Sequence, residues 1–163
     1  MLNKFLVFFL FIVLLFFGYS DAFSGSFDEA LKLAKEENKI LIVDVYTDWC
    51  GWCKKMDKDT YSNNGVKKLL YNDFICVKLD AEGSESNKYQ GKSYTSSELA
   101  VLFNVTAYPT TVFLKPDGSI IEFYYNKSKM TALPGYYGAS DFKKILKYFR
   151  DEDYLSIDLS TIL

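Results

Sequence analysis

Two cysteines three positions apart, Cys50 and Cys53, are the residues of this chain best suited to chemistry. They follow a strongly apolar run, Ile40–Tyr46, and precede a lysine-rich segment with helical character. This order predicts a strand that delivers a dithiol to a helix N-terminus, where unpaired N–H groups and the helix dipole stabilise a thiolate. The spacing therefore predicts thiol–disulfide exchange, with Cys50 as nucleophile and Cys53 close enough to resolve a mixed disulfide.

A zinc site and a permanent structural disulfide are the alternatives for this pair. Zinc needs about four ligands, but the 163 residues contain only one further cysteine, Cys76, and no histidine. A bridge across two residues closes so small a loop that its entropic gain is modest, and this spacing is typical of redox cycling. We therefore favour redox use and expect no metal. The lack of histidine also excludes Ser–His–Asp and Cys–His catalysis.

The N-terminal residues predict the compartment in which the mature protein is located. Lys4 is followed by thirteen apolar residues, Phe5–Phe17, and then by small residues that a signal peptidase reads. We expect residues 1–22 to be a signal peptide cleaved near Ala22, and the mature protein to be extracytoplasmic, either periplasmic or secreted. The alternative is a membrane anchor at Phe5–Phe17, although thirteen helical residues span about 20 Å, short of a hydrocarbon core of roughly 30 Å.

The composition supports one folded domain. Apolar residues make up 49% of the chain, and the formal net charge is −2 with acids and lysines interspersed. This apolar content is enough for a hydrophobic core, and the interspersed charges provide no basic patch for nucleic acid. We expect a domain over residues 23–150, a C-terminal tail without an assigned role over 151–163, and a monomer.

Helices and strands must position the dithiol. Ser26–Glu29 is a capping box for an amphipathic helix that ends near Asn38. Buried strands are predicted at Ile40–Tyr46 and Phe74–Asp80, with a helix from Cys50 to about Thr60 and a further turn or two between them. The helical crossover makes these two strands parallel.

The second half predicts further elements. Ala81–Thr95 is polar and is interpreted as a solvated loop, and Thr95–Glu98 is a capping box that opens another helix. Thr111–Leu114 and Ile120–Tyr125 flank a Pro-Asp-Gly turn and predict a hairpin. Ser140 is the expected cap of a last amphipathic helix.

The segment VDVYTDWCGWCK at residues 43–54 resembles the active-site strand and turn of the thioredoxin superfamily, and Ala107–Thr110 resembles its proline loop, whose X-Pro bond is cis. Residues 44–70 are most similar to the C-terminal thioredoxin-like domain of DsbD and its secreted relatives. The resemblance extends from about Ser26 to Arg150 and includes Gly135-Tyr136. It implies an α/β thioredoxin fold, with a central mixed β-sheet flanked by helices. Because a mature start at Phe23 leaves little room for the superfamily's usual first strand, we expect a trimmed sheet.

The resemblance also implies residue roles. Cys50 is similar to the exposed attacking cysteine and Cys53 to the buried resolving one. Asp44 is similar to the buried acid that accepts the proton of the second cysteine, and Lys78 to the lysine that pairs with this acid. The alternative for Asp44 is a strand-end acid bonded to local backbone. Cys76 is expected to be an inert buried thiol, with a regulatory role as the alternative.

The residues implied in substrate binding are Trp49, Gly51, Trp52, Tyr108 and Pro109. A cis Pro109 exposes the Tyr108 backbone to a substrate strand, whereas a trans proline would only begin a strand of this protein. Gly51-Trp52 replaces the family's usual Gly-Pro, so the reduction potential has to be measured. Four tyrosines are candidates either for a peptide-binding rim or for packing: Tyr124, Tyr125, Tyr136 and Tyr137.

The leading functional hypothesis is an extracytoplasmic disulfide reductase of protein substrates. It requires no cofactor beyond the redox-active Cys50–Cys53 disulfide, and it requires an electron supply, for which a membrane electron-donor protein is expected. Run in reverse, the same site is a disulfide oxidase or isomerase. The other hypotheses are a non-catalytic peptide-binding module and a specialised donor for haem-protein maturation or a single oxidised enzyme.

Overall fold

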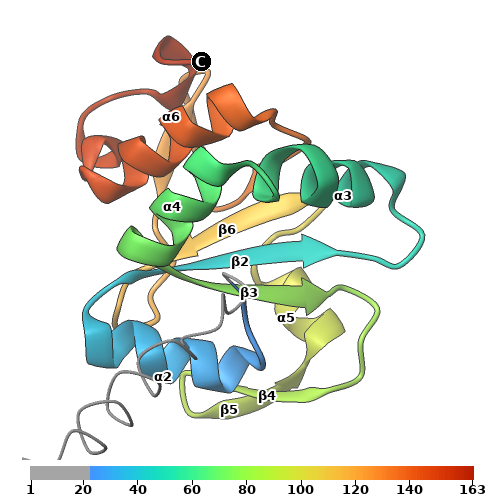
Figure 1. The fold of residues 1–163 in the computed structure, drawn as a ribbon. Helices are drawn as coiled ribbons and strands as arrows, with labels where there is room; N and C mark the ends of the chain where they lie inside the picture. Colours follow the sequence, from blue (N-terminus) through green and yellow to red (C-terminus); the bar gives the residue numbers. More distant parts are fainter. Residues whose placement is uncertain (1–22) are drawn as a thin grey trace, which may run out of the picture.

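The computed structural model describes residues 23–163, so the predicted signal peptide or anchor lies outside the described residues. A five-stranded sheet in the order β1-β3-β2-β6-β9 crosses the centre of the molecule (Figure 1). β1 and β3 run parallel to β2, whereas β6 is antiparallel to β2 and β9 to β6, so the sheet is mixed, as expected. These strands are β1 (Phe23–Ser24), β2 (Ile40–Tyr46), β3 (Phe74–Asp80), β6 (Thr110–Leu114) and β9 (Leu133–Pro134).

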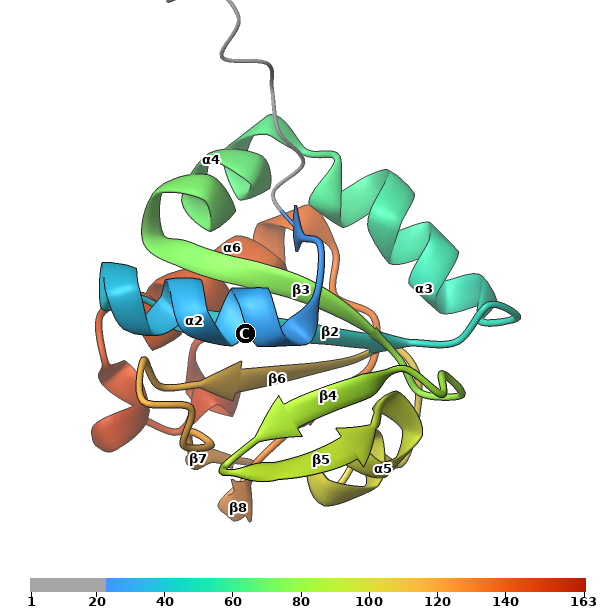
Figure 2. The ribbon, with the colours of Figure 1, turned by 90° about the horizontal axis from the view of Figure 1, so that it is seen from below.

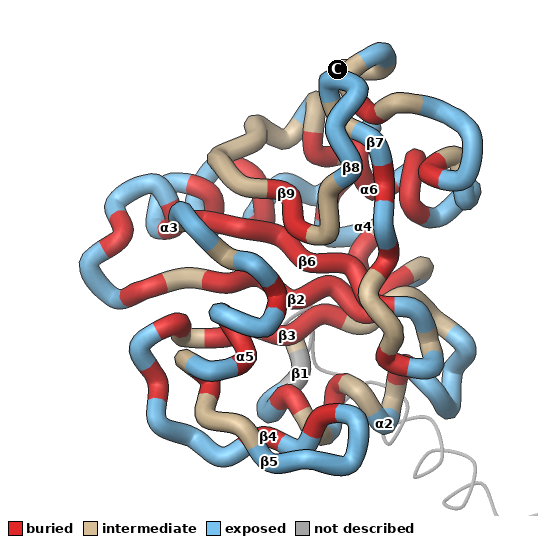
Figure 3. The backbone as a smooth tube through the Cα atoms, turned by 180° about the vertical axis from the view of Figure 1, so that it is seen from behind, coloured by how far each residue is buried: buried red, intermediate tan, exposed pale blue. Residues whose placement is uncertain are grey.

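Helices cover both faces of the sheet. α3 (Gly51–Met56), α4 (Asn64–Asp73) and α6 (Ala139–Arg150) lie on one face, and α2 (Phe27–Glu37) and α5 (Ser96–Leu102) on the other (Figures 1 and 2). Each face has its own hydrophobic core. The central strands are buried between the two layers (Figure 3).

Strand β2 shows how the sequence divides between these cores. Leu41, Val43 and Val45 belong to the α2 and α5 side, while Ile42 belongs to the α3, α4 and α6 side. Because side chains alternate along a strand, Asp44 shares the face of Ile42. The one charged residue of this buried strand is therefore placed beneath the helices that follow the dithiol.

The first two helices begin as predicted. The Ser26 capping box is present, and α2 ends at Asn38, which takes a left-handed conformation (φ 52°). The predicted helix after Cys50 forms as α3 and continues into a π-helix, η2 (Asp57–Tyr61). A π-turn is wider than an α-turn and is often found at functional sites.

One prediction about the sheet periphery agrees with the structure, and the next, a solvated loop after β3, is wrong. The sheet is trimmed at its first strand, β1, in which Phe23 and Ser24 pair with Cys76 and Val77. The polar segment after β3 forms a hairpin, β4 (Ser86–Tyr89) and β5 (Lys92–Thr95). Its strand pattern was hidden because one of the two inward positions of β4 is an asparagine, Asn87, which is buried through hydrogen bonds to Glu85 and Ser96.

The hairpin predicted after β6 also differs. The Pro-Asp-Gly turn forms, with Gly118 at φ 84°, but only Ile120 and Leu114 form a bridge. Phe123 is buried against Phe149 of α6 at 5.2 Å between ring centroids, and this packing draws the chain away from the sheet. A separate hairpin follows, β7 (Phe123–Tyr125) and β8 (Ser128–Met130), and β9 takes the place beside β6.

The C-terminal end is packed on the domain. Helix α6 begins after Gly138, so Ser140 is its second residue and does not cap it. Residues 151–163 contain two short 3₁₀ helices, η3 (Asp153–Leu155) and η4 (Leu159–Thr161), and bury Leu159. Asp158 accepts hydrogen bonds from the backbone of Asn126 and Lys127, so this segment anchors the β7–β8 turn.

Candidate redox-active site

Cys50 and Cys53 form a disulfide at the start of α3. Cys50 is the N-cap residue, and its Sγ accepts a hydrogen bond of 3.0 Å from the backbone N–H of Cys53. An N–H that points at a sulfur stabilises negative charge there, so this geometry favours a thiolate at Cys50 in the reduced protein. The expectation that Cys50 is exposed is wrong for the disulfide form, in which both cysteines expose only 4% of their surface.

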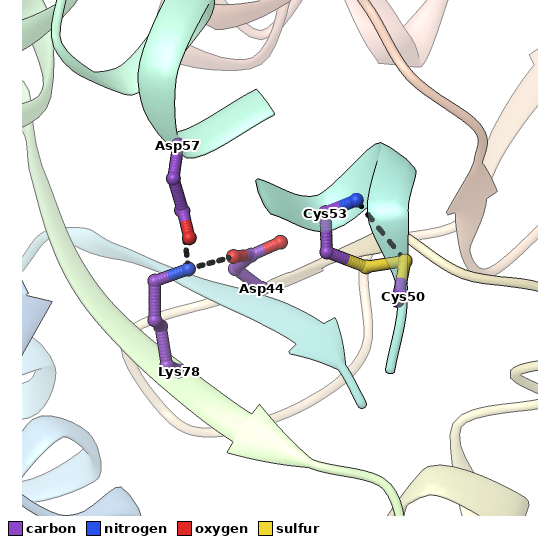
Figure 4. A network of polar contacts seen from close by, with 5 residues as sticks. All are labelled: Asp44, Cys50, Cys53, Asp57 and Lys78. Carbon is purple, nitrogen blue, oxygen red and sulfur yellow. Dashed lines mark hydrogen bonds and ion pairs between the residues drawn. A yellow bond between two sulfur atoms is a disulfide. The ribbon is translucent and has the colours of Figure 1, made fainter. Parts of the chain in front are cut away.

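A network of charges lies behind the disulfide (Figure 4). Asp44 and Lys78 are direct neighbours in the parallel pairing of β2 and β3, and Lys78 Nζ lies 2.9 Å from Asp44 Oδ2. The same ammonium lies 2.5 Å from Asp57 Oδ1, at the start of η2. The second oxygen of Asp44 points toward the side of the disulfide (Figure 4).

Burial controls the electrostatics of this network. Asp44 is only 2% exposed, and this burial raises its pKa above the ordinary value, although the Lys78 ammonium acts in the opposite direction. Burial lowers the pKa of Lys78, but the carboxylates of Asp44 and Asp57 outweigh it and raise that pKa overall. A carboxylate with a raised pKa beside a dithiol is suited to accept and return a proton.

Aromatic side chains flank the disulfide on two sides. Trp49 and Trp52 expose 66% and 59% of their surface. The Trp49 ring meets Tyr108 edge-to-face at 5.9 Å, and its Nε1 donates to both carboxylate oxygens of Glu82 at 3.1 Å. Trp52 lies 5.5 Å from the ring of Tyr136. These four aromatic residues, Trp49, Trp52, Tyr108 and Tyr136, are called the aromatic rim below.

The proline loop joins the rim to the sheet. The Tyr108–Pro109 peptide bond is cis, as the resemblance implied, and Pro109 is buried just before β6. Its carbonyl accepts a hydrogen bond of 2.8 Å from Gly135 N–H. Gly51 is exposed, with open space around its Cα. The two segments that hold the sequence-predicted substrate residues, 49–52 and 108–109, thus meet at the contact between Trp49 and Tyr108.

Other candidates lie elsewhere. Cys76 is 1% exposed on β3, and burial raises the pKa of its thiol well above the ordinary value, which fits an inert thiol. Of the four candidate tyrosines, Tyr136 is placed beside Trp52 in the rim. Tyr124 instead forms a bridge with Asp158 of the C-terminal segment.

The sequence interpretation missed two residues of the site, Asp57 and Tyr61. Both follow Cys53 at steps of four, a spacing that places side chains on one face of a helix. The signal was obscured because the segment alternates lysines with acids, which is also typical of a solvated helix face. Within residues 23–163, no cluster of three or more His, Cys, Asp or Glu side chains is arranged to hold a metal ion.

Comparison with known proteins places this geometry in a family. A family model described as a thioredoxin-like domain matches residues 27–150. The thiol:disulfide interchange protein DsbD of Pasteurella multocida is 31% identical over 91 residues, which cover 55% of this chain and 14% of that protein. A protein disulfide-isomerase of Schizosaccharomyces pombe is 26% identical over 132 residues, covering 81% of this chain and 33% of that protein. The chain thus spans a third or less of these curated relatives.

Solved structures agree in fold. A thioredoxin-fold protein from Helicobacter pylori superposes with a TM-score of 0.67 at 19% identity, covering 90% of this chain and 89% of the other. A putative disulphide-isomerase from Bacteroides thetaiotaomicron gives a TM-score of 0.57 at 33% identity, covering 77% and 89%. No helix among residues 23–163 combines the length and apolar character needed to cross a membrane. With its disulfide at a helix start and a cis proline loop, the chain belongs to the thioredoxin-like domain family.

Proposed function

We propose that this protein reduces disulfide bonds of other proteins outside the cytoplasm. The observation that carries the exchange chemistry is Asp44, a buried carboxylate of raised pKa whose second oxygen points toward the side of the disulfide (Figure 4). A reductase must activate its second cysteine while the first is bound to substrate. A proton acceptor placed behind Cys53 supports that step.

The proposed reaction begins with the reduced dithiol. The Cys50 thiolate attacks a substrate disulfide, a Cys50–substrate bond forms, and the first substrate sulfur leaves as a thiolate. Asp44 then takes the Sγ proton of Cys53, and the Cys53 thiolate attacks Cys50 Sγ. The second substrate sulfur leaves, and the proton passes from Asp44 to a product thiolate. Two electrons move from the dithiol to the substrate, which ends as one thiol and one thiolate.

The aromatic rim supports a protein substrate. Two exposed tryptophans beside the disulfide offer a large apolar surface that small thiols do not need. The Tyr108 backbone, next to the cis proline, is the proposed edge for an extended substrate segment. A membrane-bound protein with its own dithiol is the proposed electron donor. The protein is proposed to act as a monomer, with a domain over residues 23–150.

The reduction potential tests the direction of electron flow. We expect a value near that of thioredoxin, about −270 mV, when the protein is equilibrated with glutathione buffers. A value near that of DsbA, about −120 mV, would overturn the reductase assignment and support an oxidase. The Trp52→Pro variant is the matched comparison, because it restores the family's usual Gly-Pro dipeptide and shows how far Trp52 sets the potential.

The leader is tested separately. We expect the full chain, expressed in a bacterium, to be recovered from the periplasm with Phe23 as its first residue by N-terminal sequencing. Recovery from membranes with Met1 retained would favour the anchor at Phe5–Phe17, and recovery from the cytosol would contradict an extracytoplasmic role.

A further inference from the structure

The π-helix η2 carries a buried tyrosine into the charge network. Tyr61 is the last residue of η2 and is only 6% exposed. Its ring meets Phe23 of β1 at 5.1 Å and Phe142 of α6 at 5.4 Å, both edge-to-face. Contacts from two different elements hold the ring in one orientation, so the position of its hydroxyl is determined by the fold.

Tyr61 and Asp44 share one ammonium group. Lys78 Nζ lies 5.5 Å from the centre of the Tyr61 ring and 2.9 Å from Asp44 Oδ2. The rings of Phe23 and Tyr46 also lie 5.3 Å from this nitrogen. An ammonium between aromatic faces and carboxylates is held by cation–π attraction as well as by ion pairing. Lys78 is therefore restrained, and Asp44 has a fixed neighbour on one side only.

The other side of Asp44 faces unsatisfied polar groups. Asp44 Oδ1, the Tyr61 hydroxyl and Thr111 Oγ1 are all buried without a hydrogen-bond partner among residues 23–163. Asp44 and Thr111 are cross-strand partners in β2 and β6, and the Tyr61 hydroxyl interacts with both side chains. Buried polar atoms are almost always paired, so three orphaned ones at the same place call for an explanation.

We propose that Tyr61 is a positioning residue of the redox site: its hydroxyl donates to Asp44 Oδ1 when Asp44 is ionised in the reduced protein, and this bond sets the pH at which Asp44 accepts the Cys53 proton. The inference rests on the proposed function and names a further residue that it uses. Burial raises the pKa of Tyr61 well above its ordinary value, so the phenol stays a neutral donor.

The other groups that face Asp44 act differently. Lys78 on β3 donates a hydrogen bond to Oδ2 of Asp44. Asp57 on η2 is a second negative charge that disfavours ionisation of Asp44. Cys76 on β3 stays protonated because its pKa is raised by burial. Thr111 on β6 adds a hydroxyl but no charge. Tyr61 is therefore the neutral phenol that favours the ionised form of Asp44 from the side away from Lys78.

The Tyr61→Phe variant tests this role because it keeps the ring and both ring contacts. The rate at which pre-reduced protein releases reduced substrate, measured against pH, is expected to shift its acid limb to higher pH. At pH values below the pKa of Asp44 the rate should fall roughly tenfold if the apparent pKa rises by about one unit, whereas the rate on the alkaline plateau should stay unchanged. Tyr154→Phe is the control, since it removes a hydroxyl from another tyrosine of the same core cluster.

Two further measurements keep the inference falsifiable. Carbon-13 NMR titration of the Asp44 carboxyl in reduced protein needs no activity, and Tyr61→Phe should raise this pKa relative to both the wild type and Tyr154→Phe. In an Asp44→Asn background, Tyr61→Phe should leave the pH–rate profile unchanged. Superimposable titrations of Asp44 in Tyr61→Phe and wild type would overturn the inference. If the wild-type protein reduces no disulfide but Tyr61→Phe still raises the pKa of Asp44, the proposed function is overturned and the inference about Tyr61 stands.

Discussion

Replacing Cys50 with serine is expected to lower the rate of disulfide reduction by about a thousandfold or more, because no other accessible nucleophile is placed at the start of α3 in residues 23–163. The measurement is the reduction of insulin by the protein with dithiothreitol as electron source. Cys53→Ala should retain the first attack and accumulate a Cys50–substrate mixed disulfide, visible on a non-reducing gel. This pair of results assigns the attacking and the resolving sulfur.

Cys76→Ala is the matched control for both variants. It removes a cysteine of similar burial from β3, and it is expected to leave the rate of insulin reduction unchanged. Trapping of substrate on Cys50→Ser, or comparable activity of Cys53→Ala and the wild type, would contradict the assigned order of attack. A Cys50→Ser, Cys53→Ser double variant with full biological function would favour the non-catalytic binding module instead.

Asp44→Asn is expected to slow the release of reduced substrate at pH 7 by about a hundredfold, because a general acid–base group contributes roughly that much or more. The asparagine keeps the size of the side chain but cannot accept the Cys53 proton. The pH dependence that Asp44 imposes on this step should disappear as well. Stopped-flow measurement of product release over a range of pH tests both results, and Asp48→Asn, an exposed acid after the same strand, is the control.

The Asp44→Asn variant is expected to be more stable than the wild type, although it is slower. Because burial raises the pKa of Asp44, the folded protein holds this proton more tightly than the unfolded chain does. The stabilisation that protonated Asp44 contributes is therefore fully present at pH values below the ordinary aspartate pKa. It is lost as the pH rises through the raised folded value. Each unit by which the pKa is raised corresponds to about 1.4 kcal/mol. Urea unfolding of Asp44→Asn should show a gain over the wild type that grows as the pH rises from the ordinary aspartate pKa to the raised folded value and then levels off.

Much of the fold followed from local patterns. The apolar runs that became β2 and β3, and the capping boxes at Ser26 and Thr95, are signals carried by adjacent residues, and all of them appear in the structure. The β4–β5 hairpin was missed because Asn87 occupies an inward position, where only tertiary hydrogen bonds make a polar residue acceptable. The route of β7 to β9 depends on Phe123 packing against α6, which is a long-range contact that no local pattern reports.

The candidate site divides in the same way. Cys50 and Cys53 are adjacent in the chain, and the resemblance supplied Asp44 and Lys78, whose contact depends on the register of two strands. Asp57 and Tyr61 were not predicted because their orientation results from a π-turn, and a single sequence does not distinguish a π-turn from an ordinary helix. The orphaned oxygen of Asp44 appears only once three strands and η2 are assembled.

The placement of the two tryptophans has an optical consequence. The chain contains only two, Trp49 and Trp52, and they flank the disulfide as exposed members of the aromatic rim. A disulfide quenches the emission of a nearby indole, whereas a dithiol quenches it far less. Both tryptophans therefore sit where oxidation dims their emission and reduction brightens it. The redox state of each molecule is carried in its own emission, without any added label.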